Sequence, residues 1–177
     1  LDISYSNPGL YTTNCTGNFT NNTCDRFLNF YRCNDMLIEN NVFKNLIQNS
    51  NSNNITFKRN LFLGTSNQIE WHSRVLMVWN DTSVTIINNT FSEFDMYANE
   101  SYPSYIIGID YSVDIDIRNN IFWNISDTTN AYVIANLGFG NAADINIEYN
   151  NIQGGADEVY GSHSWGLGNI NEDPLFT

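Results

Sequence analysis

Residues 115–122 read IDIRNNIF, and this pattern occurs five times along the chain at fixed internal offsets. Each copy can be anchored on one asparagine, and the anchors are Asn41, Asn60, Asn89, Asn120 and Asn150. The position two residues after the anchor is apolar in every copy and holds Phe43, Phe62, Phe91, Phe122 and Ile152. The positions three and five residues before the anchor are also apolar, whereas the positions between them are mostly polar. This alternation predicts one strand before the anchor and a second strand after it.

The anchors lie 19, 29, 31 and 30 residues apart, and repeats of this length are typical of solenoids. The main competitor is the leucine-rich horseshoe, but the repeats lack its leucines and its helical segment. Three short strands with turns fill the interval, and successive coils of that kind stack at about 4.8 Å. The sequence therefore predicts an all-β parallel β-helix of about five to six coils. Each anchor asparagine is expected at a corner, in the left-handed backbone region, and the phenylalanines are expected to stack inside.

Three of the repeats, IENNVF at 38–43, IINNTF at 86–91 and IRNNIF at 117–122, resemble the right-handed parallel β-helix repeat of the pectate-lyase-like superfamily. The segment GNINEDPLF at 168–176 resembles the final-coil motif of many secreted members. The resemblance covers residues 28–177 and implies a single-stranded right-handed β-helix. It says little about activity, because the superfamily contains lyases, hydrolases, adhesins, tailspikes and structural repeats. Residues 1–27 are expected to form an N-terminal cap or docking arm.

Three longer intervals each contain a further apolar run, and these runs predict the third strand of their coils at 74–79, 105–109 and 132–135. The shorter interval contains QNSNSNN at 48–54, which is composed of turn residues and predicts a turn alone. Inserts precede the third strands at 68–73, 93–103 and 126–130. We expect them to be loops on one side of the helix, where binding residues tend to lie.

The chain has 177 residues, the length of one domain, with a net charge of −12 and a pI of about 4.2. This charge disfavours nucleic acid and anionic membrane surfaces as partners. No run of apolar residues is long enough to predict membrane insertion. The chain begins at Leu1 without a methionine or signal peptide, which suggests a processed protein or a segment of a longer one.

Asparagine is unusually abundant, with 31 copies, and eight of them begin N-x-S/T glycosylation sequons. These are Asn14, Asn18, Asn21, Asn54, Asn80, Asn88, Asn99 and Asn124. Their placement in turns and loops predicts glycans on several of them and an extracellular or cell-surface location.

The cysteines Cys15, Cys24 and Cys33 lie nine residues apart without a nearby histidine, a spacing that is not a zinc pattern. In a secreted chain we expect one disulfide that clamps the first coil. The sequence leaves the pairing open. The remaining cysteine is then either buried as a small apolar residue or joined to another chain.

Candidate catalytic residues are few. Asp110, Arg74, Glu70 and His72 lie on or beside the third strands of adjacent coils, but their spacing matches no lyase or galacturonase motif. Whether the chain is an enzyme is therefore left open, with catalysis the weaker reading. Asp114 above Asp144 would offer a Ca²⁺ site. Both residues also lie at a turn position of the repeat, where aspartate is common without a metal. No other cofactor is expected.

Two functions remain. The first is an extracellular, glycosylated structural β-helix protein, a subunit or repeat of a surface fibre that self-associates head to tail into a filament. It is favoured because no amphipathic helix covers the open strands at either end. The second is a carbohydrate-active enzyme, either a polysaccharide lyase or a glycoside hydrolase, or a sugar-binding module that uses a groove on the β-helix. A third possibility, an adhesin module within a longer chain, rests on the same stacked coils as the first and differs only in covalent continuity.

Overall fold

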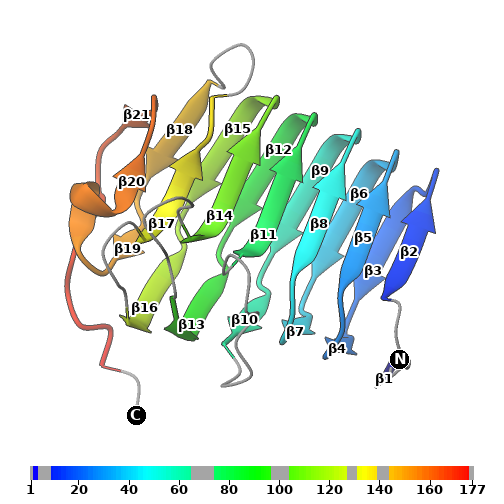
Figure 1. Ribbon diagram of the computed structural model, residues 1–177, viewed down its shortest axis with the longest axis horizontal. Helices are drawn as coiled ribbons and strands as arrows, with labels where there is room; N and C mark the ends of the chain where they lie inside the picture. Colours follow the sequence, from blue (N-terminus) through cyan, green and yellow to red (C-terminus); the bar gives the residue numbers. More distant parts are fainter. Residues whose placement is uncertain are drawn as a thin grey trace.

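The computed structural model is a single-stranded parallel β-helix, and the fold predicted from the repeat is confirmed. It describes residues 2–3, 9–64, 74–96, 104–126, 131–138 and 144–175. Neighbouring strands are parallel throughout, and each strand pairs with strands one coil away. In Figure 1 the coils are stacked side by side along the long axis, from the N-terminal coil at the right to the C-terminal coil at the left. Each of the three sheets contains seven strands.

The strands fall into three sheets, which we call sheets A, B and C. Sheet A contains β1 (Asp2–Ile3), β4 (Thr23–Cys24), β7 (Val42–Phe43), β10 (Leu61–Leu63), β13 (Thr90–Asp95), β16 (Ile121–Ser126) and β19 (Asn151–Ile152). Sheet B contains β2 (Leu10–Thr13), β5 (Leu28–Tyr31), β8 (Ile47–Ser50), β11 (Arg74–Trp79), β14 (Ser104–Asp110), β17 (Ala131–Asn136) and β20 (Val159–Tyr160). Sheet C contains β3 (Gly17–Thr20), β6 (Asn34–Glu39), β9 (Asn53–Lys58), β12 (Thr82–Ile87), β15 (Val113–Arg118), β18 (Ile145–Glu148) and β21 (Ser164–Trp165).

One short 3-10 helix, η1 (Gly155–Glu158), lies in the last coil. No helix in the described part of the chain is long and apolar enough to cross a membrane. Strands β2, β3 and β4 pair with β5, β6 and β7, so the stack of coils extends into residues 1–27.

The corners of the helix are built by residues with positive φ. At the corner from sheet B to sheet C, these residues form the B–C column of Asn14, Arg32, Asn51, Asn80 and Tyr111. At the corner from sheet C to sheet A, they form the C–A column of Asn21, Asn40, Arg59, Asn88, Asn119 and Tyr149. Asparagine dominates both columns because it tolerates the left-handed region better than most residues do.

The anchor asparagines do not have positive φ, so this part of the sequence prediction is wrong. The left-handed residue is the one before each anchor, as Asn88 precedes Asn89. The left-handed turn at Asn88 directs the chain around the corner, and the next side chain then points inward. Asn89 is 1% exposed, while Asn88 is exposed.

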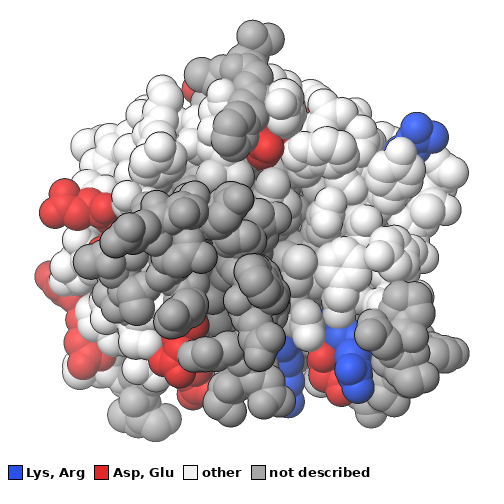
Figure 2. Space-filling model, in the orientation of Figure 1, with Lys and Arg blue, Asp and Glu red and all other residues white. Residues whose placement is uncertain are grey.

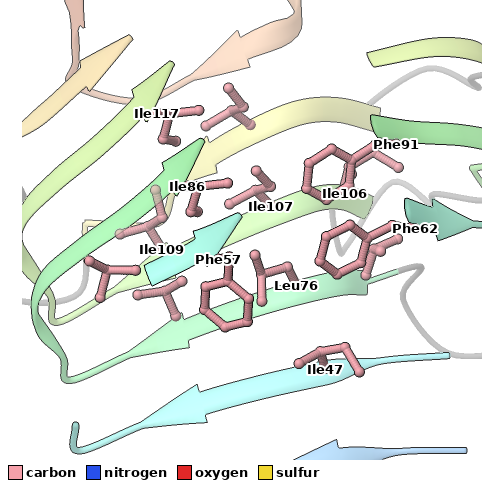
Figure 3. Packing of buried hydrophobic residues seen from close by; sticks show 14 of the residues in the cluster. Ile47, Phe57, Phe62, Leu76, Ile86, Phe91, Ile106, Ile107, Ile109 and Ile117 are labelled. Carbon is pink, nitrogen blue, oxygen red and sulfur yellow. The ribbon is translucent and has the colours of Figure 1, made fainter. Parts of the chain in front are cut away.

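The core is made of side-chain columns that run along the helix axis. Phe62 stacks on Phe91 with ring centroids 4.4 Å apart, and Phe91 stacks on Phe122 at 4.7 Å. Figure 3 shows the rings of Phe62 and Phe91 near isoleucines of sheets B and C. Each fully buried aromatic or branched side chain contributes about 1.5–3 kcal/mol. Because inward and outward side chains alternate along the strands, the three sheets enclose one continuous apolar core.

The prediction of a turn alone at 48–54 is also wrong. Residues Ile47–Ser50 form β8, which pairs with β5 and β11. Apart from the core residue Ile47 its side chains are polar, yet Asn49 and Ser50 are buried. Strand formation here depends on backbone hydrogen bonds to the coils on both sides, which are independent of side-chain type.

Candidate functional site

The C–A corner carries a ladder of buried amides. Seven stacked asparagines form it, and these are Asn22, Asn41, Asn60, Asn89, Asn120, Asn150 and Asn169. The Oδ1 atom of Asn89 accepts from the backbone N–H of Asn60 at 2.9 Å and from its Nδ2 at 3.0 Å. The Nδ2 atom of Asn89 donates to the carbonyl of Phe57 at 2.9 Å. Each amide thus satisfies buried backbone groups that the turn would leave unpaired.

The B–C corner carries a second ladder, which the sequence analysis missed. Its members are Cys33, Ser52, Asp81 and Ser112, one on each of four successive coils. The backbone N–H of Cys33 donates to the Ser52 Oγ at 3.1 Å, and that of Ser52 donates to the Asp81 Oδ1 at 2.7 Å. The backbone N–H of Asp81 donates to the Ser112 Oγ at 3.1 Å. These side chains differ, so no repeated letter marks the ladder in the sequence.

Asp81 is the one carboxylate among these ladder residues, and it is 1% exposed. Burial raises its pKa from 3.8 to about 7, although backbone N–H groups of Ser52 and Trp79 donate to it and oppose the shift. The buried Asn49 amide is close enough to lower the pKa of Asp81, yet neither of its polar atoms makes a well-formed hydrogen bond. The interior at this corner therefore favours a neutral, protonated Asp81.

The N-terminal end of the same corner is held covalently. Cys15 and Cys33 form a disulfide with a Cα–Cα distance of 4.5 Å, and this bond joins the first coil to the second. The prediction of one disulfide is confirmed. Cys24 is free and buried, and burial raises its pKa to about 11. Its thiol is therefore protonated at neutral pH and packs as a small apolar group.

Seven of the eight sequon asparagines lie in the described residues, and Asn99 lies outside them. All seven are exposed, whereas the amide ladder contains no sequon asparagine. Six of them have positive φ, and these are Asn14, Asn21, Asn54, Asn80, Asn88 and Asn124. Two are held by the preceding coil, because Asn54 donates to the Asp35 Oδ1 and Asn80 to the Asn51 Oδ1, both at 2.7 Å. These side chains sit on the lateral surface, where an attached sugar would extend into solvent.

The structure separates the candidate catalytic residues. Arg74 is in register with Tyr105, while Asp110 is in register with Trp79, at the other end of the same two strands. Five residues of strand separate the two positions, a distance of about 16 Å. Glu70 and His72 lie outside the described residues. On sheet B, Met77, Tyr105 and Ala135 form a small buried apolar cluster that is separate from the main core.

The two residues proposed for Ca²⁺, Asp114 and Asp144, hold equivalent positions on adjacent coils, because Ile115 pairs with Ile145. Asp114 and Asp144 are both exposed, and Asp116 pairs with the Nε of Arg118 at 3.0 Å. Within the described ranges, no group of three or more His, Cys, Asp or Glu side chains is placed to hold a metal ion.

No family model matches this chain, and no curated protein or solved structure matches it. Its function is therefore inferred from its own geometry.

Proposed function

We propose that this chain is an extracellular, glycosylated structural β-helix that assembles head to tail into a filament. The observation that carries the proposal is the state of the core column at the C-terminal end. Trp165 is in register with Ile147, which is fully buried, yet Trp165 is 37% exposed. Trp165 thus holds a core position but pairs with a neighbouring coil on one side alone in this chain, and its apolar surface is available to a further coil.

The other end of the same column is also incompletely covered. Phe19 is in register with Ile38, which is fully buried, but Phe19 itself is only half-buried. A second copy stacked in line would place its Phe19 on Trp165 and bury both. In the same arrangement its Asn22 would follow Asn169 and extend the amide ladder. Stacking of unlike surfaces by translation does not close and so produces a filament.

The distribution of charge along the chain favours head-to-tail over tail-to-tail assembly. Residues 1–88 contain six acidic and six basic residues, whereas residues 89–177 contain thirteen acidic residues and one basic residue. Figure 2 shows most acidic side chains of this face toward the C-terminal coils, and Lys and Arg toward the N-terminal coils. Two C-terminal ends would repel each other, while a C-terminal end meets no such repulsion at the N-terminal end of the next copy.

Secretion and glycosylation are supported by the disulfide and by the exposure of the sequon asparagines. The strand–NN–Phe repeats and the segment at 168–176 support placement with the pectate-lyase-like β-helix proteins. Among the members of that superfamily, the structural and fibrous proteins are the better analogy, because the end coils of this chain are exposed.

Assembly can be tested on the unglycosylated chain by sedimentation velocity over a range of concentrations and by electron microscopy. We expect rods that lengthen with concentration and have an axial repeat of about 34 Å, the rise of seven coils. Trp165→Ser should shift the population to monomers, because it removes the apolar contact at the junction.

Trp79→Ser is the matched control, since Trp79 is 38% exposed but lies on the side of the rod. It should leave rod formation unchanged. Monodisperse monomers of the parent chain at high concentration, or equal effects of the two substitutions, would contradict the proposal.

A further inference from the structure

Three exposed apolar side chains surround one sequon. In the described residues from 12 to 148, the exposed large hydrophobic side chains are Trp79, Tyr111 and Val113, which are 38%, 52% and 41% exposed. We call these three residues the corner patch. All other exposed large hydrophobic side chains that the structure describes belong to the first coil or to residues 149–175. The corner patch therefore needs an explanation other than an open end of the helix.

The register of β11, β12, β14 and β15 places this patch around Asn80. Trp79 immediately precedes Asn80 and pairs with Asp110, while Thr82 pairs with Val113. Asn80 and Tyr111 lie between these two pairs, and the Asn80 backbone N–H donates to the Asp110 carbonyl at 2.9 Å. Asn80 and Tyr111 are therefore stacked neighbours on adjacent coils, about 4.8 Å apart. Thr82, the hydroxyl residue of this sequon, lies beside Val113.

The side chain of Asn80 is already oriented. One Nδ2–H donates to the Asn51 Oδ1 at 2.7 Å on the preceding coil, and the residue is exposed. An asparagine that carries a sugar keeps one N–H, so this bond can persist after modification. Tyr111 has a φ of 52°, where asparagine is favoured and tyrosine is strained. Strained backbone positions of this kind cluster at functional sites, which makes the Tyr111 ring a candidate contact surface.

We propose that Asn80 carries an N-linked glycan whose first sugar packs against the ring of Tyr111 and covers the corner patch. This inference rests on the proposed glycosylation. The occupant is supplied by the chain itself, because the sequon lies in the middle of the patch. A sugar ring presents C–H groups on one face, and contact with an aromatic ring removes apolar surface of both from water.

Asn88 provides a matched comparison on the same coil. It is also exposed, has a φ of 56° and begins a sequon. Its neighbour on the next coil is Asn119 instead of an aromatic residue, as shown by the pairing of Ile87 with Arg118 and of Thr90 with Ile121. A glycan at Asn88 therefore has no ring beside it in this column.

The test uses chain secreted from a glycosylating host, with site occupancy measured by mass spectrometry. Thr82→Val removes the sequon at Asn80, and Thr90→Val removes that at Asn88, without changing either asparagine. We expect both sites to be occupied in the parent. Thr82→Val should lower Tm by about 2–4 °C more than Thr90→Val does, the shift expected for loss of a modest contact in a chain of this length. The same substitutions in unglycosylated protein should show no such difference.

Tyr111→Ser should abolish the extra loss of Tm caused by Thr82→Val. It should also remove the upfield ring-current shift that we expect for protons of the Asn80-linked sugar in NMR spectra. Occupancy at Asn88 without occupancy at Asn80, or a glycan at Asn80 without coupling to Tyr111, would overturn the inference while leaving glycosylation of the chain intact. An absence of sugar at every sequon would overturn both. The filament test does not depend on either result.

Discussion

The two polar corners of this β-helix solve the same structural problem with different chemistry. Both must satisfy backbone N–H groups that point into the turn between two sheets. At the C–A corner asparagines do so, and each member after Asn22 accepts from the coil before it while it donates to a carbonyl, as Asn89 does. At the B–C corner two serines and an aspartate accept these N–H groups, and a disulfide joins the first two coils.

The difference shows that identical residues are sufficient for a corner ladder but are not required. An asparagine bonds the coil before it and the coil after it, so the C–A ladder repeats without change. At the B–C corner the two serine hydroxyls accept from the preceding coil and donate to carbonyls, whereas the third acceptor is a buried carboxyl group with a raised pKa. The C–A corner is therefore expected to be insensitive to pH, and the B–C corner to be sensitive to pH and to reduction.

The largest effect is expected when the uniform ladder is broken in its middle. Asn89→Ala leaves the backbone N–H of Asn60 and the carbonyl of Phe57 without their partners. Each unsatisfied buried group costs about 1–3 kcal/mol, so the free energy of unfolding should fall by on the order of 2–6 kcal/mol. Urea denaturation measures this change. Asn88→Gly, at the exposed left-handed position next to it, should be nearly neutral, and equal losses would contradict the role of the ladder.

The next effect concerns pH at the mixed ladder. Because the pKa of Asp81 is raised from 3.8 to about 7 in the folded state, folding favours its protonated form. The stabilisation is complete below the unfolded pKa and is lost as pH rises through about 7. Between pH 5 and 8 this contribution should decline by on the order of 3 kcal/mol, at about 1.4 kcal/mol per pKa unit.

The measurement is the free energy of unfolding at pH 5 and pH 8 for the parent and for Asp81→Asn. The variant should lack the part of the pH dependence that belongs to Asp81. Asp114→Asn, at an exposed position, should retain the parent's dependence. Parallel pH profiles for the parent and Asp81→Asn would show that Asp81 is not the linked group.

The smallest effect is expected at the last member of the mixed ladder. Ser112→Ala removes the acceptor for the backbone N–H of Asp81 and the donor to the carbonyls of Val78 and Asp110. The loss should be about 1–2 kcal/mol, smaller than for Asn89→Ala because Asn89 also bonds the side-chain amides of the asparagines on both neighbouring coils. Thermal unfolding of the two variants under the same conditions makes the comparison. A larger loss for Ser112→Ala would reverse the proposed ranking of the two corners.

The repeated residues are the part of the sequence from which the fold could be predicted. Asn89, Asn120 and Phe91 recur at fixed offsets, and a period of two distinguishes inward from outward positions. The fold class and the positions of most strands follow from that pattern. The sequence also shows which asparagines begin sequons, but only the structure separates the exposed corner residues from the buried amide ladder. Asn88 and Asn89 are adjacent and identical, and the turn geometry alone assigns their roles.

The sequence alone determined that this chain repeats and that the repeats form coils, because the core columns require the same kind of residue at the same offset in every coil. Tertiary structure alone decided that Ile47–Ser50 is a strand and that Ser52, Asp81 and Ser112 form one ladder. It also placed Tyr111 beside Asn80. The physical reason is that pairing between coils uses backbone groups, so unlike side chains far apart in the sequence become neighbours without any shared pattern.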